Sequence, residues 1–253
     1  MSLVDVRNIK KVYDGRTIIQ HINIHLNKGE IVSLLGVSGA GKTTLFHCIS
    51  GLIMPEEGQV FLNGEDVTGK PGKISYMLQK DMLFPYKHII DNVALPLVLK
   101  GMSKEEARKK VEPDFKEFGL EGTEMQYPAQ LSGGMRQRAA LLRTYQASNG
   151  VALLDEPFSA LDQITKDAMH TWYLDVMQKI DLSTLFITHD IDEAITLSDR
   201  IYMLTGTPGE ISDEIIIKEP KPRPADFNLS DEFLSYKRKV VSSLQKANPT
   251  QII

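Results

Sequence analysis

Apolar and polar residues follow two patterns along this chain, and each predicts a different kind of strand. Short, mostly apolar runs are typical of strands buried on both faces of a parallel sheet. Such runs occur at residues 31–35, 151–154 and 184–188. Residues 21–26 alternate polar and apolar side chains instead, which predicts a strand with one buried and one solvent-facing side. We therefore expect β-structure over residues 3–26, with His21 and His25 facing solvent and without a metal role.

Helical patterns replace the strand patterns between about residues 88 and 147. Ser103 to Glu106 has the sequence of a helix capping box, and Pro113 should break the helix that this box begins. Apolar residues follow the box at helical spacing, at Ala107, Val111, Phe115 and Phe118. Because strand patterns flank this stretch, we expect a helical subdomain that is inserted into an α/β core.

These patterns divide the chain into a core, an insertion and a tail. Residues 1–85 and 149–217 are expected to form the α/β core with an antiparallel β part, and residues 86–148 the helical subdomain. The tail, residues 218–253, begins with a proline-rich stretch that predicts a stiff, extended linker. A short amphipathic helix is expected to follow the linker.

The stretch Gly36–Thr44 lies directly between an expected buried strand and an expected helix. A strand, a glycine-rich loop, Lys-Thr and a helix form the context that a phosphate-binding P-loop requires. The glycines let successive backbone N–H groups surround an anion, and the helix N-terminus adds its positive end. Lys42 supplies a charge for the β- and γ-phosphates, and the Thr43 hydroxyl can hold Mg²⁺. A chance match in a glycine-rich turn is disfavoured by the flanking pattern, so the sequence predicts a nucleotide-binding protein.

Two adjacent acids end the apolar run at residues 151–154. Asp155 can help to coordinate Mg²⁺, directly or through water, and Glu156 is placed to orient or deprotonate an attacking water. The alternative is a structural aspartate that caps a helix, and the P-loop upstream makes this alternative less favoured. Gln79 stands at the end of another expected strand, residues 73–78, and strand ends beside a phosphate site are where ligands bind in open α/β sheets.

A second helix N-terminus in the chain is suited to an anion. Within residues 131–137, Ser132 is an expected N-cap residue, and two glycines follow it before the helix continues. One nucleotide does not need two such sites in one chain, so the economical explanation is that the second site serves the nucleotide of another copy. A merely well-capped helix is the alternative, but it would not explain glycines at two successive early helical positions.

Together these stretches resemble the nucleotide-binding subunit of ATP-binding cassette (ABC) transporters over residues 3–217. The family's motifs occur in order: Walker A at 36–44, the Q-loop residue Gln79, the signature at 131–137, Walker B at 151–155 followed by Glu156, the D-loop at 159–162 and the switch histidine His189. Two departures are visible: Met135 stands where many members have glutamine, and residues 144–148 replace a more usual small-apolar run. We expect neither departure to change the chemistry.

The resemblance implies a role for each motif residue. Catalytic roles fall to Lys42, Gln79, Glu156 and His189. Mg²⁺ would be held by Thr43, Gln79 and Asp155. ATP would be bound by an aromatic residue that stacks on adenine, by Walker A and by signature and D-loop residues: Tyr13, Gly36, Ser38, Gly39, Ala40, Gly41, Lys42, Thr43, Thr44, Ser132, Gly134 and Asp162.

The resemblance also implies a fold and an assembly. The fold would be an α/β P-loop ABC cassette, in which a RecA-like parallel core and an antiparallel β subdomain carry an inserted α-helical subdomain. Two subunits, which we expect to be a homodimer, would close head to tail around two ATP molecules and drive transmembrane permease subunits. Residues 82–86 are apolar and would either contact the permease or pack in the core.

Finer resemblance favours importer ATPases for nitrate, sulfonates, taurine or pyrimidine precursors of thiamine. The cues are residues 77–85, the turn at residues 206–210 and the proline-rich tail. An extracellular or periplasmic solute-binding protein would then act with the permease and only indirectly with this chain. The solute and the identity of the second ATPase subunit stay open.

Composition narrows the alternatives. The net charge of −4 predicts no nucleic-acid partner, and the single cysteine excludes an internal disulfide. No run approaches about 18 apolar residues, so we expect the chain to reach the cytoplasmic face of the membrane through the permease. A non-transport ABC ATPase is disfavoured, because those of DNA maintenance carry long heptad repeats and those of translation carry a second cassette. An exporter is disfavoured, because its cassette is usually fused to membrane helices. A small-molecule kinase is disfavoured, because it has no need of the signature.

Overall fold

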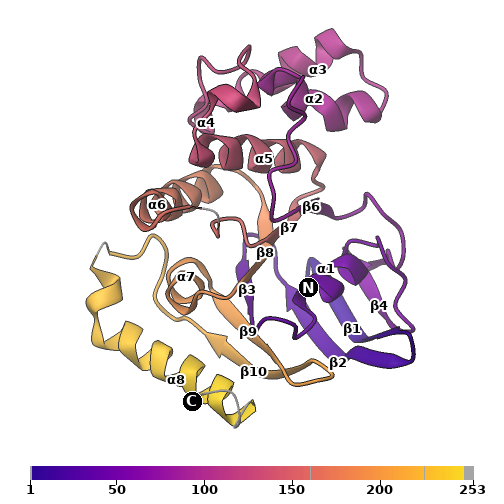
Figure 1. Cartoon of the computed structure of the whole chain (residues 1–253), viewed down its shortest axis with the longest axis vertical. Helices are drawn as coiled ribbons and strands as arrows, with labels where there is room; N and C mark the ends of the chain where they lie inside the picture. Colours follow the sequence, from indigo (N-terminus) through magenta and orange to yellow (C-terminus); the bar gives the residue numbers. More distant parts are fainter. Residues whose placement is uncertain (1, 160, 225, 248–253) are drawn as a thin grey trace. The chain divides into compact units, whose positions relative to one another are not determined.

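The computed structural model describes residues 2–159, 161–224 and 226–247 of the 253-residue chain. Contacts between residues group the chain into two compact units (Figure 1). The first unit comprises residues 1–74 and 183–253, and the second comprises residues 75–182. The two units are defined by contacts between residues, whereas the domains expected from the sequence are defined by its patterns and motifs. The expected domain boundaries therefore stay a prediction.

An antiparallel sheet forms one part of the first unit. Its strands are β1 (Val4–Tyr13), β2 (Arg16–Leu26), β4 (Glu57–Leu62) and β5 (Glu65–Asp66), in the order β2-β1-β4-β5. The hairpin between β4 and β5 turns at Asn63 and Gly64, whose φ angles are 52° and 82°. Positive φ at both positions is what an Asn-Gly hairpin turn requires. The β-structure expected for residues 3–26 is confirmed.

A second group of strands in the first unit is mostly parallel. It consists of β3 (Ile31–Leu35), β8 (Ser183–Thr188), β9 (Arg200–Thr205) and β10 (Glu210–Ile216). β3 pairs in parallel with β8 on one side and β9 on the other, and β10 pairs antiparallel with β9. β3, β8 and β9 are buried along their whole length, as expected for strands covered on both faces. Helices α1 (Lys42–Ile49) and α7 (Ile191–Leu197) follow β3 and β8.

The tail helix packs against the first unit. α8 (Asp231–Ala247), which follows the short helix η2 (Phe227–Leu229), buries Phe233, Tyr236 and Val240 in one apolar cluster with residues of α7, β9 and β10. Two cationic side chains attach the proline-rich stretch before it to the rest of the first unit. Arg223 donates hydrogen bonds to three carbonyl oxygens at the end of α7, and Lys221 forms an ion pair with Asp199 (2.7 Å). Cations at a helix C-terminus satisfy carbonyl groups that have no partner within the helix.

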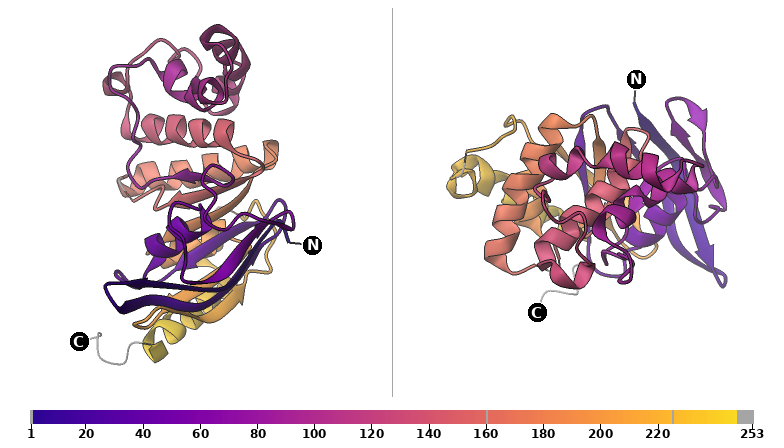
Figure 2. Two further views of the ribbon diagram at one scale, coloured as in Figure 1. Left: turned by 90° about the vertical axis from the view of Figure 1, so that its right-hand side faces the viewer. Right: turned by 90° about the horizontal axis from the view of Figure 1, so that it is seen from above.

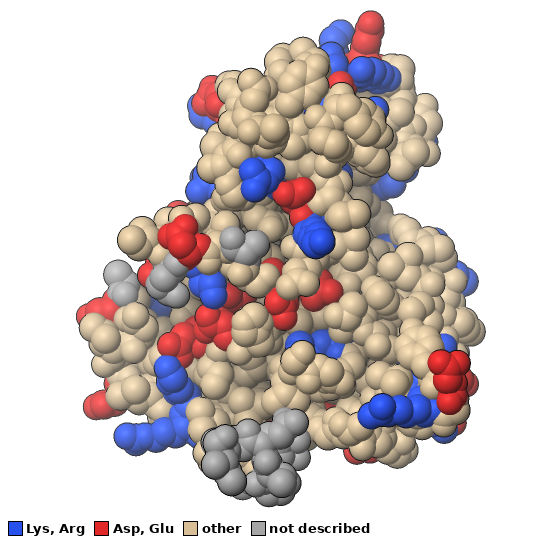
Figure 3. All heavy atoms as spheres, viewed as in Figure 1, with Lys and Arg blue, Asp and Glu red and all other residues tan. Residues whose placement is uncertain are grey.

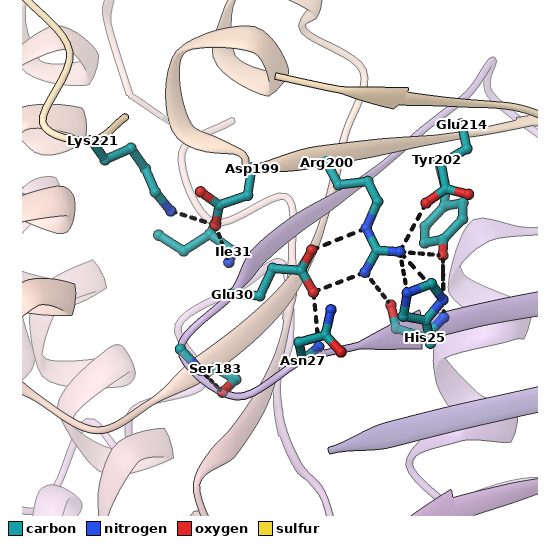
Figure 4. Close-up of polar contacts among 11 residues, drawn as sticks. His25, Asn27, Glu30, Ile31, Ser183, Asp199, Arg200, Tyr202, Glu214 and Lys221 are labelled. Carbon is teal, nitrogen blue, oxygen red and sulfur yellow. Dashed lines mark hydrogen bonds and ion pairs between the residues drawn. The ribbon is translucent and has the colours of Figure 1, made fainter. Parts of the chain in front are cut away.

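Arg200 is the centre of a buried polar cluster at the beginning of β9 (Figure 4). Its guanidinium forms ion pairs with Glu30 and Glu214, each at 2.8 Å, and the residue is only 5% exposed. Burial alone would lower the pKa of Arg200, but hydrogen bonds to both glutamates raise it above its ordinary value. A buried charge of this kind requires such partners.

His25 belongs to the same cluster, so the expectation that it faces solvent is wrong. Its ring is partly buried, contacts the Arg200 guanidinium and forms a hydrogen bond with the Tyr202 hydroxyl (3.1 Å, Figure 4). The alternating pattern correctly placed His25 away from the apolar side of β2, but it cannot reveal polar partners from distant strands. His21 is exposed, as expected.

Replacing Arg200 with leucine is expected to lower the free energy of unfolding by about 3 kcal/mol, because Glu30 and Glu214 lose their buried partner. Urea unfolding followed by circular dichroism measures this change. Arg7→Leu is the matched control, since the Arg7–Asp5 pair is largely exposed (Arg7 side chain 62%) and should contribute less than about 1 kcal/mol. Equal, small losses in both variants would contradict the central role of Arg200.

The second unit combines a short strand pair with a helical layer. β6 (Ser75–Met77) pairs in parallel with β7 (Val151–Asp155). The helices are α2 (Ile89–Leu99), α3 (Lys104–Val111), α4 (Asp114–Glu117), η1 (Pro128–Gln130), α5 (Gly133–Ala147) and α6 (Gln163–Lys179). Figure 2 shows α5 between α2 on one side and α6 on the other, and the Arg138 guanidinium of α5 lies 4.7 Å from the Trp172 ring centroid of α6.

The boundaries of α3 and α4 in the second unit lie where local sequence signals predicted them. Ser103 and Glu106 form the reciprocal hydrogen bonds of a capping box at the start of α3. Pro113 separates α3 from α4, as predicted for a residue without a backbone N–H. The apolar positions expected at helical spacing are all buried: Ala107, Val111, Phe115 and Phe118.

The described part of the chain contains no helix that combines the length and apolar character needed to cross a bilayer. On the face shown in Figure 3, the basic side chains lie singly or in small groups among other residues. Nucleic-acid-binding domains usually carry a clustered basic surface. The described residues on this face do not form such a surface, in keeping with the net charge of −4.

Candidate functional site

The P-loop follows β3 in the first unit, and its glycines allow unusually close backbone contacts. A Cβ atom on Gly36 would lie 2.2 Å from the carbonyl oxygen of Leu204 in β9. One on Gly41 would lie 2.5 Å from Cγ2 of Ile19 in β2, and Gly41 also has a φ of 95°, where glycine is favoured. The course of the loop therefore depends on glycine at both of its ends.

Lys42 closes the loop at the first turn of α1. Its ammonium donates hydrogen bonds to the carbonyl oxygens of Gly36 (2.7 Å) and Val37 (2.9 Å). Ser38, Gly39 and Thr43 are exposed around it, whereas Ala40 is buried and Thr44 is partly buried. A helix N-terminus, a glycine-rich loop and a cation thus occur together, which is an anion-binding arrangement.

The turn at residues 206–210 supports this loop, a role that the sequence did not reveal. The Gly209 N–H donates to the carbonyl of Ile18 (2.8 Å), and the Gly209 carbonyl accepts from the N–H of Gln20 (3.0 Å). A Cβ atom on Gly209 would lie 2.2 Å from the carbonyl oxygen of Ala40 in the P-loop. The turn is thus fixed to β2 on one side and touches the phosphate loop on the other.

Gly209→Ala is expected to weaken ADP binding about tenfold or more, because the added methyl group must displace the Ala40 backbone, and small misplacements of binding groups are costly. Titration calorimetry with ADP measures the change. Gly72→Asn is the control, since Gly72 has open space around its Cβ position and asparagine tolerates its left-handed backbone. If Gly209→Ala bound ADP like the parent chain, the turn would not support the loop.

His189 and the P-loop leave the sheet of the first unit at the same edge. β3 and β8 are parallel, and their last residues, Leu35 and Thr188, are paired. His189 follows directly and is exposed. Asp190 then caps α7, since one of its carboxylate oxygens accepts from the N–H groups of residues 192 and 193 (3.0 and 3.1 Å). The cap fixes the backbone that carries the histidine.

Tyr13, which the sequence resemblance assigns to adenine, is the last residue of β1. The residue is 40% exposed, so its ring is accessible to a ligand. The ammonium of Lys11 lies 5.1 Å from the ring centroid. The structure thus places an accessible aromatic ring in the first unit, the unit that also carries the P-loop.

Asp155 ends β7 in the second unit and is nearly buried, with 7% of its surface exposed. The Tyr76 hydroxyl donates a hydrogen bond to Asp155 Oδ2 (2.9 Å). Burial and the neighbouring carboxylate raise the pKa of Tyr76, so the hydroxyl stays protonated and remains a donor at neutral pH. Sequence reasoning missed Tyr76, because an aromatic residue in a short strand usually signals packing only.

Glu156 combines a strained backbone with a direct contact to Gln79. Its φ is 47°, in the left-handed region that non-glycine residues rarely adopt. Gln79 Nε2 donates a hydrogen bond to Glu156 Oε2 (3.0 Å). Residues that were selected from two separate sequence motifs therefore meet within the second unit. Strain at such a position is often retained for function.

The signature and the D-loop both begin helices of the second unit. Ser132 is the exposed N-cap of α5, and its Oγ accepts from the Met135 N–H (3.3 Å), so the capping role considered from sequence is real. Gly134 is buried, and a Cβ atom there would meet Thr165 of α6 at 3.5 Å. Asp162 caps α6 by accepting from Thr165. Ala160, within the expected D-loop, lies outside the described residues.

Comparison with known proteins identifies the family. The family described as ABC transporter matches residues 19–159. The chain is 44% identical over 191 residues to the formylaminopyrimidine import ATP-binding protein ThiZ of Halalkalibacterium halodurans, covering 76% of this chain and 74% of that protein. It is 35% identical over 258 residues to the nitrate import ATP-binding protein NrtD of Synechocystis sp., covering 98% and 97%. A dimeric ATP-binding cassette solved with ADP and Pi in a post-hydrolysis state matches with a TM-score of 0.72 at 30% identity, over 86% of this chain and all of that one.

The chain therefore belongs to the ABC transporter family and is an ATP-hydrolysing cassette. The α/β P-loop fold expected from the sequence, with its parallel core, antiparallel β part and helical insertion, is confirmed.

ATP and Mg²⁺ are the ligands of such a cassette, and the residues present fit them. Among the described residues no group of three or more His, Cys, Asp or Glu side chains could hold a metal ion by itself. Mg²⁺ needs no such group, since it is usually bound through one or two carboxylates together with substrate phosphates. Asp155 offers one such carboxylate, and the expectation that Thr43, Gln79 and Asp155 hold the ion stays a prediction.

Proposed function

We propose that this chain is the motor subunit of an ABC importer, peripheral to the cytoplasmic face of the membrane. The observation that carries the proposal is the occurrence of two glycine-rich helix beginnings in one chain, the P-loop at α1 and the Ser132 cap at α5. The relatives ThiZ and NrtD are both named as import ATP-binding proteins, which supports import over export or a role outside transport.

The proposed chemistry transfers the γ-phosphoryl group of ATP to water. Tyr13 stacks on adenine, and the P-loop N–H groups with Lys42 hold the β- and γ-phosphates. Glu156 accepts a proton while the water oxygen attacks the γ-phosphorus, and the bond to the β–γ bridging oxygen breaks to release ADP. Gln79 orients Glu156 through the hydrogen bond described above, and His189 contacts the γ-phosphate. Thr43, Asp155 and Gln79 would hold Mg²⁺, which would supply positive charge to neutralise the phosphates.

The proposed active form is a head-to-tail dimer. Ser132 and Gly134 of one copy complete the phosphate site of the other, with Asp162 close to the same nucleotide. Ser132 is exposed at the beginning of α5, and its hydroxyl proton remains available as a donor, because the cap uses only the oxygen as an acceptor. Support comes from the dimeric ADP-bound relative. Closing and reopening of the dimer would move the permease between its access states.

The segment at residues 82–86 is the proposed contact with the permease. Met82, Phe84 and Tyr86 are 57%, 36% and 70% exposed, whereas Leu83 is buried. The buried Asn92 side chain bonds to both the N–H and the carbonyl of Phe84, and Arg143 donates to the carbonyl of Met82 (2.8 Å). Apolar side chains are thus held outward on a fixed backbone, which favours a partner surface over the core-packing alternative.

The proposed solute class is nitrate, sulfonates, taurine or a pyrimidine precursor of thiamine, delivered to the permease by a solute-binding protein. The relatives named for nitrate and formylaminopyrimidine import support this class. These partners would select the solute, because the proposed role of this chain is only to bind and hydrolyse ATP.

A mixture of Lys42→Ala and Ser132→Arg chains tests the shared site. Each variant alone should hydrolyse ATP poorly, because both composite sites of its dimer are damaged. In a random mixture half of the dimers are mixed and one of their two sites is intact, so up to about a quarter of the parent rate should return. Phosphate release measures the rates.

Ser103→Arg is the matched control, since it removes another serine N-cap from the same unit at a cost of about 1 kcal/mol and should leave hydrolysis intact. Full activity of Ser132→Arg alone, or a mixture no better than the average of its components, would contradict the shared site.

A further inference from the structure

An ion pair between Lys11 and Glu56 joins the end of β1 to the segment that follows the P-loop helix. Lys11 is 8% exposed, and its ammonium donates hydrogen bonds to the Met54 carbonyl (3.0 Å) and to Glu56 Oε1 (2.7 Å). The second carboxylate oxygen of Glu56 accepts from the backbone N–H of Val12 (2.7 Å). Both oxygens of one carboxylate thus hold the two residues that precede Tyr13.

The same ammonium also faces the aromatic ring. Lys11 Nζ lies 5.1 Å from the centroid of the Tyr13 ring, which is a cation–π distance. The Lys11 ammonium therefore contacts both the Glu56 carboxylate and the Tyr13 ring. A base can stack only on the part of the ring that the ammonium leaves free.

Both members of the pair are charged at neutral pH. The hydrogen bond to Glu56 raises the pKa of Lys11 above its ordinary value, although burial opposes this. Burial would raise the pKa of Glu56, but the hydrogen bonds from Lys11 and Val12 outweigh it and lower the pKa. The contact is therefore a charge-assisted one throughout the neutral range.

A neighbouring pair shows what such a contact looks like without the aromatic ring. Lys10 and Glu57, the adjacent residues of the same two segments, also form an ion pair at 2.7 Å. Their side chains are 34% and 55% exposed. This pair joins the same chain segments, whereas the ammonium that faces the Tyr13 ring is that of Lys11.

We propose that Lys11 and Glu56 are positioning residues that fix the Tyr13 ring as the platform for the adenine base. The pair sets the direction of the ring through the Val12 backbone and the ammonium, and it ties this platform to the segment that leaves α1, the helix of the P-loop. The inference rests on the proposed function, because it takes Tyr13 as the adenine contact.

Equilibrium binding of two probes to the full chain tests the inference. AMP-PNP, a non-hydrolysable ATP analogue, contacts both platform and P-loop, whereas inorganic tripolyphosphate has no base and contacts only the P-loop. Tyr13→Ala should weaken AMP-PNP binding about tenfold, as loss of a stacking contact does, and Glu56→Gln about three- to tenfold. Tripolyphosphate affinity should stay within about twofold in both variants.

Three further variants sharpen the test. Glu57→Gln, the matched control, should bind both probes like the parent chain. Lys11→Met should behave like Glu56→Gln, and Lys11→Arg, which keeps the charge, should restore most of the AMP-PNP affinity. In the double variant Tyr13→Ala/Glu56→Gln the second change should add nothing, because its effect acts only through the ring. Thermal melting confirms that each variant is folded, and Glu56→Gln alone decides the matter if Lys11→Met is unfolded.

The contrary outcomes separate the inference from the function on which it rests. If Tyr13→Ala weakens AMP-PNP binding but Glu56→Gln does not, the positioning role is wrong and the platform stands. If Glu56→Gln weakens both probes equally, or adds its full effect to Tyr13→Ala, the pair acts on the P-loop or on folding and the inference is overturned. If Tyr13→Ala binds AMP-PNP like the parent chain, the adenine platform itself is wrong, and the inference fails with it.

Discussion

Close backbone contact around the P-loop is the constraint on which the first unit depends. Three glycines leave no room for a side chain: Gly36 against the Leu204 carbonyl, Gly41 against Ile19 and Gly209 against the Ala40 carbonyl. Through these contacts β2, β9 and the 206–210 turn all touch the same few residues. Both groups of strands in the first unit therefore help to fix the loop that binds phosphate. Preorganised N–H donors bind an anion without reorganisation, so a loop held on several sides suits this task.

In the second unit the corresponding constraint is local and lies at the ends of elements. Glu156 follows β7 with a left-handed backbone, which costs a non-glycine residue about 1–2 kcal/mol, and Gln79 reaches its carboxylate from the end of β6. Ser132 and Asp162 begin α5 and α6, where N–H groups without helical partners are available. In this unit, the residues proposed for catalysis and those proposed to contact the nucleotide of the other copy thus lie where a strand ends or a helix begins.

Local signals in the sequence were sufficient for much of this architecture. The P-loop, the capping box at Ser103, the break at Pro113 and the Asn63-Gly64 turn each depend on a few neighbouring residues, and each is confirmed. Buried strands were visible as apolar runs for the same reason. The assignment to the ABC family rested on motifs whose order along the chain is specific, and the comparisons confirm it.

Contacts between distant residues were not predictable, because a pattern along the chain does not indicate which distant residue a side chain will contact. Arg200 meets Glu30 across 170 positions, and Lys11 meets Glu56 across 45. His25 was misplaced and Tyr76 was overlooked for this reason. The roles of the individual site residues, as distinct from their positions, also come from resemblance and stay predictions.

Chemical cross-linking between two copies tests the head-to-tail site most directly. A Glu156→Gln chain carrying Ser38→Cys is mixed with a Glu156→Gln chain carrying Ser132→Cys and treated with a short bismaleimide. The native Cys48 does not interfere, because it is fully buried and burial raises the pKa of its thiol to about 11. The account predicts a cross-linked dimer that forms with ATP and not with ADP. A cross-link that is absent with ATP, or that forms within one chain carrying both cysteines instead of between chains, would contradict it.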